Sequence, residues 1–116
     1  MSSRRGTFAD FVVDQLGDLG AVESRAMFGG LGLYSRHTFF GIVFKERLYF
    51  LTDKSSRAAY VAKGMRPFQP RARQTLGNYF EVPADIVEDR YQLALWARTA
   101  IATRKATAGA RKPVAG

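Results

Sequence analysis

The sequence contains no cysteine, which excludes disulfide bonds, thiolate metal ligands and cysteine nucleophiles. It has a single histidine, and its acidic residues are scattered or stand where helices are expected to begin, so no metal site is predicted. No apolar run approaches the roughly 20 residues that a membrane-spanning helix needs. The first residues also lack the apolar segment of a signal peptide. We therefore expect no cofactor, no metal, no membrane contact and a cytoplasmic location.

The composition nevertheless provides for one folded core. Of the 116 residues, 47% are hydrophobic and 13% are aromatic, which suits a single domain of ordinary size. We expect this domain over residues 7–105, between a short basic end at 1–6 and a basic tail at 106–116. The tail consists mainly of Thr, Ala, Gly, Arg, Lys and Pro, and such a composition favours disorder.

The net charge of +8 is concentrated at the two ends of the chain. Between 6 and 102 there are 12 basic and 10 acidic residues, so the body is nearly neutral. A basic protein invites a nucleic-acid interpretation, although solvated tails with no partner explain the same charges. Arg71 and Arg73 add an expected basic loop without an acidic neighbour. The candidate nucleic-acid contacts are Arg4, Arg5, Arg71, Arg73, Arg104, Lys105, Arg111 and Lys112.

Hydrophobic periodicity predicts three helices and five strands. Thr7 is well placed as the N-cap of the first helix, with Asp10 at its third position. Asp53 is expected to cap the second helix, and Asp85 with Glu88 is expected to open the third. The helices are expected over 8–19, 54–63 and 86–103, and the strands over 25–34, 38–44, 47–52, 65–68 and 77–82.

This order, α-β-β-β-α-β-β-α, favours a two-layer α+β domain with an antiparallel sheet. Short polar connections at 35–37 and 45–46 suit hairpins. The first three expected strands carry large apolar residues on both faces. One face would pack on helices, and the other would need a protein partner, the chain's own ends or a second copy of the chain to cover it.

The segments that could carry chemistry have plainer structural interpretations. Residues 28–33 are rich in glycine, but they lack the Lys-Ser/Thr ending of a phosphate loop and no helix follows them. His37 lies in an expected hairpin loop beside an arginine, which is typical of a solvated side chain. Lys45, Arg47 and Tyr49 could share one face as a nucleic-acid platform, but only if the aromatic ring is exposed. Arg25 and Tyr34 are the polar groups to inspect if a groove between helix and sheet binds a small molecule.

The run Arg25-Ala26-Met27-Phe28-Gly29-Gly30-Leu31-Gly32-Leu33-Tyr34 resembles the signature of the TfoX/Sxy N-terminal domain family. Further matching pieces follow in order at 40–43, 48–53, 64–68, 79–83 and 96–100, so the resemblance covers roughly residues 8–102. It implies a two-layer α+β fold similar to secretion-chaperone-like domains. The signature residues expected to be structural are Arg25, Met27, Phe28, Gly29, Gly30, Gly32 and Tyr34.

The resemblance also implies a function. The family is associated with regulation of bacterial competence through transcription, and it supplies no catalytic residue. Because only a basic tail follows residue 105, we expect a stand-alone single-domain member. The leading hypothesis is therefore a non-enzymatic regulatory or adaptor domain that binds protein partners, a second copy among them. The alternatives are weak, sequence-independent nucleic-acid binding through the tails with Arg71 and Arg73, and a small-molecule or enzymatic role.

Overall fold

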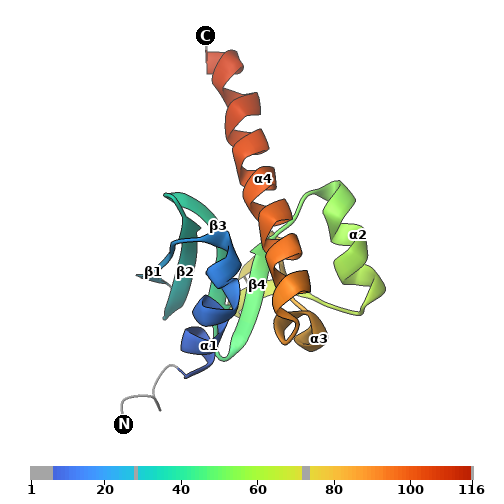
Figure 1. Ribbon diagram of the computed structural model, residues 1–116. Helices are drawn as coiled ribbons and strands as arrows, with labels where there is room; N and C mark the ends of the chain where they lie inside the picture. The colour runs from blue at the N-terminus through green and yellow to red at the C-terminus, as the bar shows by residue number, and fades with distance from the viewer. Residues whose placement is uncertain (1–6, 28, 72–73, 116) are drawn as a thin grey trace.

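The computed structural model describes residues 7–27, 29–71 and 74–115 and has an α+β fold, as predicted. Its six strands form one antiparallel sheet in the order β1-β2-β3-β4-β6-β5 (Figure 1). The strands are β1 Val22–Met27, β2 Gly30–Ser35, β3 Thr38–Phe44, β4 Arg47–Leu51, β5 Pro67–Arg71 and β6 Gln74–Glu81. The helices are α1 Thr7–Gln15, the 3-10 helix η2 Leu16–Leu19, α2 Lys54–Ala62, α3 Ala84–Val87 and α4 Arg90–Ala115.

The glycine-rich segment forms a hairpin and not the single strand predicted over 25–34. β1 and β2 pair antiparallel with Arg25 opposite Gly32, and Gly29 stands between them at φ 80°. That backbone conformation is costly for residues with a side chain and free for glycine. The predicted strand count was wrong by one because the turn lies within an apolar run that carries no polar turn residue.

Close packing explains the next two glycines of the signature. A Cβ atom on Gly30 would lie 2.3 Å from the carbonyl oxygen of Val43, on the neighbouring strand. A Cβ atom on Gly32 would lie 2.5 Å from the sulfur of Met27 and 3.1 Å from the ring of Phe39. The backbone of the neighbouring strand therefore requires glycine at position 30, whereas at position 32 the tightest contact is with the flexible Met27 side chain.

The second face of the sheet is covered by the sheet itself. Ile42 and Phe68 are fully buried, and the ring of Phe68 lies 5.3 Å from Phe44 and 4.7 Å from Tyr49. Within the described residues, the edge strand β5 thus packs an aromatic side chain against side chains of the central strands β3 and β4. This part of the face is therefore buried by the chain's own β5, whereas a protein partner or a second copy stays a prediction.

The other face packs against the helices. α4 lies along β3 and β4, and it contributes Leu93, Ala97 and Ala100, each fully buried (Figure 1). The guanidinium of Arg90 donates to the carbonyl oxygen of Asp14 at 3.0 Å, so it ties α1 to the start of α4. Cations are stabilising at such helix C-termini.

Of the predicted caps at Asp53 and Asp85, the first was correct and the second was wrong. Asp53 caps α2 as predicted, since its carboxylate accepts the Ser56 amide at 2.7 Å and Ser56 reciprocates. Asp85 is not a cap: it lies inside the four-residue α3 and pairs with Lys63 at 3.3 Å. Asp89 accepts the Gln92 amide at 3.0 Å where α4 begins. Asp85 and Asp89 are each followed three residues later by Glu or Gln, so the capping pattern fits two different helix starts.

The last helix is longer than its expected end near residue 103. Its backbone is helical to Ala115, where the sequence predicted a disordered tail from 106, and it projects past the sheet (Figure 1). The Thr103 and Thr107 hydroxyls each donate at 2.9 Å to the carbonyl oxygen four residues earlier. Alanine and lysine in this stretch also favour the helix, so the composition that indicated disorder is compatible with helix extension.

We predict that Gly30→Ala lowers the free energy of unfolding by about 3 kcal/mol, because the added methyl group meets a backbone oxygen that cannot rotate away. Gly77→Ala is the matched control: no atom of the described residues lies within 4 Å of its Cβ position, and the change should be below about 0.5 kcal/mol. Urea unfolding of both variants measures the difference. Equal effects would contradict a packing role for the signature glycine.

Candidate functional site

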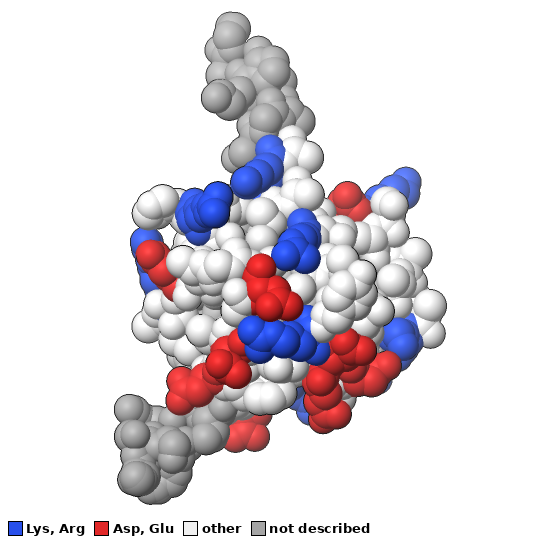
Figure 2. Space-filling model, in the orientation of Figure 1, with Lys and Arg blue, Asp and Glu red and all other residues white. Residues whose placement is uncertain are grey.

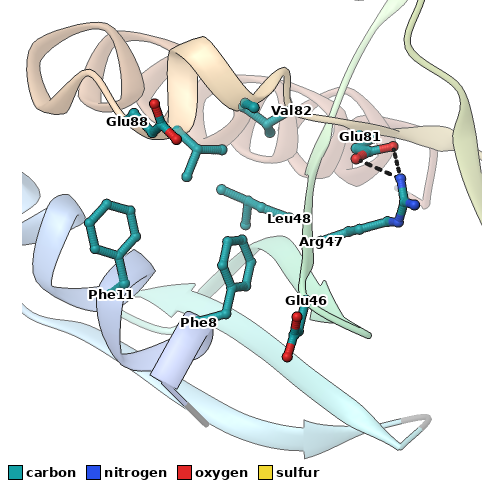
Figure 3. A pocket seen from close by; sticks show the side chains of 10 residues that line it. Phe8, Phe11, Glu46, Arg47, Leu48, Glu81, Val82 and Glu88 are labelled. Atoms are coloured by element: carbon teal, nitrogen blue, oxygen red, sulfur yellow. Dashed lines mark hydrogen bonds and ion pairs between the residues drawn. The ribbon is translucent and has the colours of Figure 1, made fainter.

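An open pocket of about 310 Å³ lies between α1, β4 and α3 (Figure 3). Its wall is mainly apolar. Leu48, Val82 and Val87 are buried, Phe8 is half-buried and Phe11 is 42% exposed. Phe8 and Phe11 project from α1 toward the side chains of β4 and α3. The full lining is Phe8, Phe11, Glu46, Arg47, Leu48, Glu81, Val82, Ala84, Val87 and Glu88.

Three carboxylates from three parts of the fold surround this apolar wall. Glu46 comes from the β3–β4 turn, Glu81 from the end of β6 and Glu88 from the end of α3. Glu81 is matched by Arg47, whose Nη1 lies 3.1 Å from both carboxylate oxygens. Within the described residues, Glu46 and Glu88 form no ion pair. The pocket rim is therefore negative in a chain whose net charge is +8.

This negative rim belongs to a larger separation of charge. On the face seen in Figure 2, acidic side chains gather over the end of the molecule where α1 and α3 lie. Basic side chains predominate toward the C-terminal half of α4. The pocket thus opens at the acidic end, far along α4 from the basic tail sequence.

A second pocket of about 420 Å³ lies between α2 and α4. Its walls include the rings of Tyr60 and Trp96, which meet edge to face with centroids 4.7 Å apart. Leu95 is 39% exposed beside them. None of the described residues that line this groove is charged; they are Ser55, Ser56, Ala59, Tyr60, Gln92, Leu95, Trp96 and Thr99.

The signature residues gather on the β1–β2 hairpin, away from both pockets. The guanidinium carbon of Arg25 lies 4.8 Å from the centre of the Tyr34 ring, and its nitrogen lies 3.8 Å from Glu23. Neither Arg25 nor Tyr34 lines either pocket, so neither pocket supports the small-molecule hypothesis. Phe28 lies outside the described residues.

Among the basic candidates, Arg104 has a structural role. Its Nη2 donates to the Tyr79 hydroxyl at 2.6 Å and its Nε to the Phe39 carbonyl at 3.2 Å, which joins α4 to the sheet. Lys105 is exposed. Arg71, Arg111 and Lys112 belong to β5 and α4, but their side chains are not described; Arg4, Arg5 and Arg73 lie outside the described residues.

The other sequence-based platforms do not form. Tyr49 is only 8% exposed and Arg47 is paired with Glu81, so these residues offer no open stacking surface with Lys45. His37 stands exposed in the β2–β3 turn. No group of three or more potential metal ligands occurs in the described ranges. Within the same ranges, no helix is both long and apolar enough to cross a membrane.

The pocket itself was missed from the sequence. Phe8 and Phe11 lie three residues apart in the first expected helix, and this spacing alone cannot distinguish a buried ring from a half-covered one. The rim carboxylates lie far apart in the sequence and meet only through the sheet.

The fold and its pockets define a small α+β domain that pairs a curled antiparallel sheet with a layer of helices and carries an open, acid-rimmed apolar pocket. The model of the TfoX N-terminal domain matches residues 14–103. The chain therefore belongs to the TfoX N-terminal domain family. No curated protein matches the chain.

The burial of Tyr60 between the helices leads to a prediction about the stability of the protein at alkaline pH. Tyr60 is 4% exposed, and desolvation raises the pKa of its hydroxyl well above the ordinary value of 10.0. A tyrosine whose pKa is higher in the folded state than in the unfolded state contributes its full stability at pH values below the unfolded-state pKa. This contribution is lost as the pH rises through the folded-state pKa. Tyr60→Phe should therefore lose less stability than the natural chain above pH 10.0.

Urea unfolding at a series of pH values from neutral to pH 11 tests this prediction. For each protein, the quantity compared is the loss in the free energy of unfolding between the two ends of the series. Tyr91→Phe is the matched control, because Tyr91 is 67% exposed, and it should follow the natural chain. Parallel curves for Tyr60→Phe and the natural chain would contradict a desolvated Tyr60 hydroxyl.

Proposed function

We propose that this chain is a non-enzymatic regulatory or adaptor domain that controls transcription, as in competence, by binding a protein partner. Family membership supports a regulatory role. The observation that carries the protein-binding part is the open pocket, in which Phe11 keeps 42% of its surface exposed next to other apolar side chains. Apolar surface left open beside a polar rim is typical of sites that bind other proteins.

The proposal that the chain acts without catalysis rests on its side-chain inventory. The sequence has no cysteine and one histidine, and that histidine stands in an exposed turn. Most of the described carboxylates have structural roles: two cap helices, four form ion pairs, and Glu46 and Glu88 stand on the pocket rim. A cysteine-free sequence also suits the reducing cytoplasm, where we place its action.

Replacing Phe11 in the cell that encodes the chain tests the regulatory proposal. Phe11→Ser removes the exposed ring of the pocket, and we expect the transcript changes that follow deletion of the gene. Val61→Ser is the matched control: Val61 is 57% exposed on α2 and lines neither pocket, so transcripts should stay normal. Immunoblotting confirms equal amounts of both variants.

Two outcomes contradict the regulatory proposal. Deletion without any change in transcripts would remove the regulatory role. A normal transcript profile with Phe11→Ser, when deletion does change transcripts, would show that regulation does not pass through this pocket.

The basic end of the chain favours weak nucleic-acid binding as a second candidate function. Lys105 is exposed on α4, and Arg111 and Lys112 follow in the same helix. No acidic residue occurs after Asp89, so nothing in this part of the sequence offsets these charges. Phosphate contacts of this kind hold nucleic acid without reading its sequence.

Fluorescence anisotropy with an arbitrary DNA duplex at several salt concentrations tests this candidate. Replacing Lys105, Arg111 and Lys112 together by Gln should flatten the slope of log affinity against log salt by about 0.9 for each lost phosphate contact. Arg36→Gln, in the exposed β2–β3 turn, is the single-charge control. An absence of binding by the natural chain at low salt would exclude DNA as a direct partner.

A further inference from the structure

We propose that the acid-rimmed pocket binds a partner-protein segment in which one large apolar side chain is flanked by lysine or arginine. This inference rests on the proposed function and names the chemistry of the partner. Three features of the pocket support it: the volume, the apolar residues of the wall and the charges on the rim.

The apolar wall determines the central feature of the segment. Leu48, Val82 and Val87 are buried at its base, and Phe8 and Phe11 stand as two rings on one side. A volume of about 310 Å³ is at the lower end of the range for ligand sites, which leaves room for an anchor of side-chain size and not for a whole helix. Burying such an anchor would remove the exposed part of Phe11 from water.

The rim determines what flanks the anchor. Glu46 and Glu88 lie around the opening without an ion-pair partner among the described residues, and Glu81 shares Arg47. Three carboxylates against one guanidinium leave the opening negative. A segment with lysine or arginine beside its anchor complements this charge, whereas an acidic segment is repelled.

The groove between α2 and α4 is the contrasting surface. It is also apolar, but the described residues that line it carry no charge and give no indication of the chemistry of an occupant. Charge complementarity therefore favours the α1–β4–α3 pocket as the selective one. Two segments of this chain share the proposed chemistry in part: residues 1–6 with Arg4 and Arg5, and the basic tail of a second copy.

The first experiment is selection of peptides from a displayed random library on the full-length chain. We expect enriched peptides to contain Phe, Leu or Met with at least one adjacent Lys or Arg. Enrichment of neutral or acidic peptides would overturn the inference, as would a failure to enrich any sequence.

The second experiment measures the binding of one selected, fluorescently labelled peptide to variants. Glu46→Gln with Glu88→Gln should weaken binding roughly tenfold at low salt, and the difference should shrink in 1 M salt because screening removes the rim's contribution. The matched control is Glu23→Gln with Asp14→Asn, which makes the same change in net charge at two exposed carboxylates outside the pocket. Equal effects of the two pairs would overturn a specific role for the rim.

Two further measurements on the full-length chain distinguish a partner protein from the other possible occupants of the pocket. If Arg4→Gln with Arg5→Gln tightens peptide binding severalfold, the chain's own first residues compete for the pocket, and the partner assignment is overturned. If sedimentation equilibrium shows a dimer that Glu46→Gln with Glu88→Gln dissociates, the occupant is a second copy, which also overturns it. A monomer whose peptide affinity is unchanged by the Arg4 and Arg5 substitutions supports the proposal.

Failure of this inference is distinguishable from failure of the proposed function. Transcript changes with Phe11→Ser but none with Glu46→Gln and Glu88→Gln would leave regulation through the pocket standing and remove the basic segment. Peptide binding as predicted, with normal transcripts in every pocket variant, would leave the peptide site standing and remove the regulatory role.

Discussion

The contact between α4 and the centre of the sheet is the constraint on which the rest of the structure depends. Leu93, Ala97 and Ala100 are fully buried there, and two of the three are alanine, so the helix lies close against β3 and β4. Arg90 and Arg98 then fasten the first helical segment, through the carbonyl oxygens of Asp14 and Asp18. Trp96 and Arg104 connect α4 to α2 and to the sheet, so a single helix positions every other helical element.

The position of α4 also explains where the open surface lies. At the end of the sheet where α4 begins, α1 and the short α3 provide the cover for β4, and they leave Phe11 partly exposed. The carboxylates of the turn, of β6 and of α3 converge on the same end, whereas the basic residues follow the other end of α4. A small domain thus presents an apolar, negative opening and a basic helix at opposite ends, an arrangement that suits an adaptor.

Local signals in the sequence were enough to predict much of the fold. β3 was predicted with its exact bounds and Asp53 as a cap, because alternation and capping are properties of neighbouring residues. The sequence pattern does not reveal the β1–β2 turn, because Gly29 makes it without polar residues, and it places a cap at Asp85 where the structure has one at Asp89. The candidate site could not be predicted: Glu46, Glu81 and Glu88 meet only once the strands pair, and exposure of Phe11 depends on how far α3 reaches.

Nuclear magnetic resonance mapping of a bound peptide tests the central claim most directly, since it reports where binding occurs and not only whether it does. A ¹⁵N-labelled full-length chain would be titrated with a peptide selected as above. We expect the largest amide shifts on Phe8, Phe11, Leu48, Val82 and Val87, and no change in the α2–α4 groove. Shifts concentrated at Ser55, Ala59, Leu95 and Thr99, or spread without a centre, would contradict it.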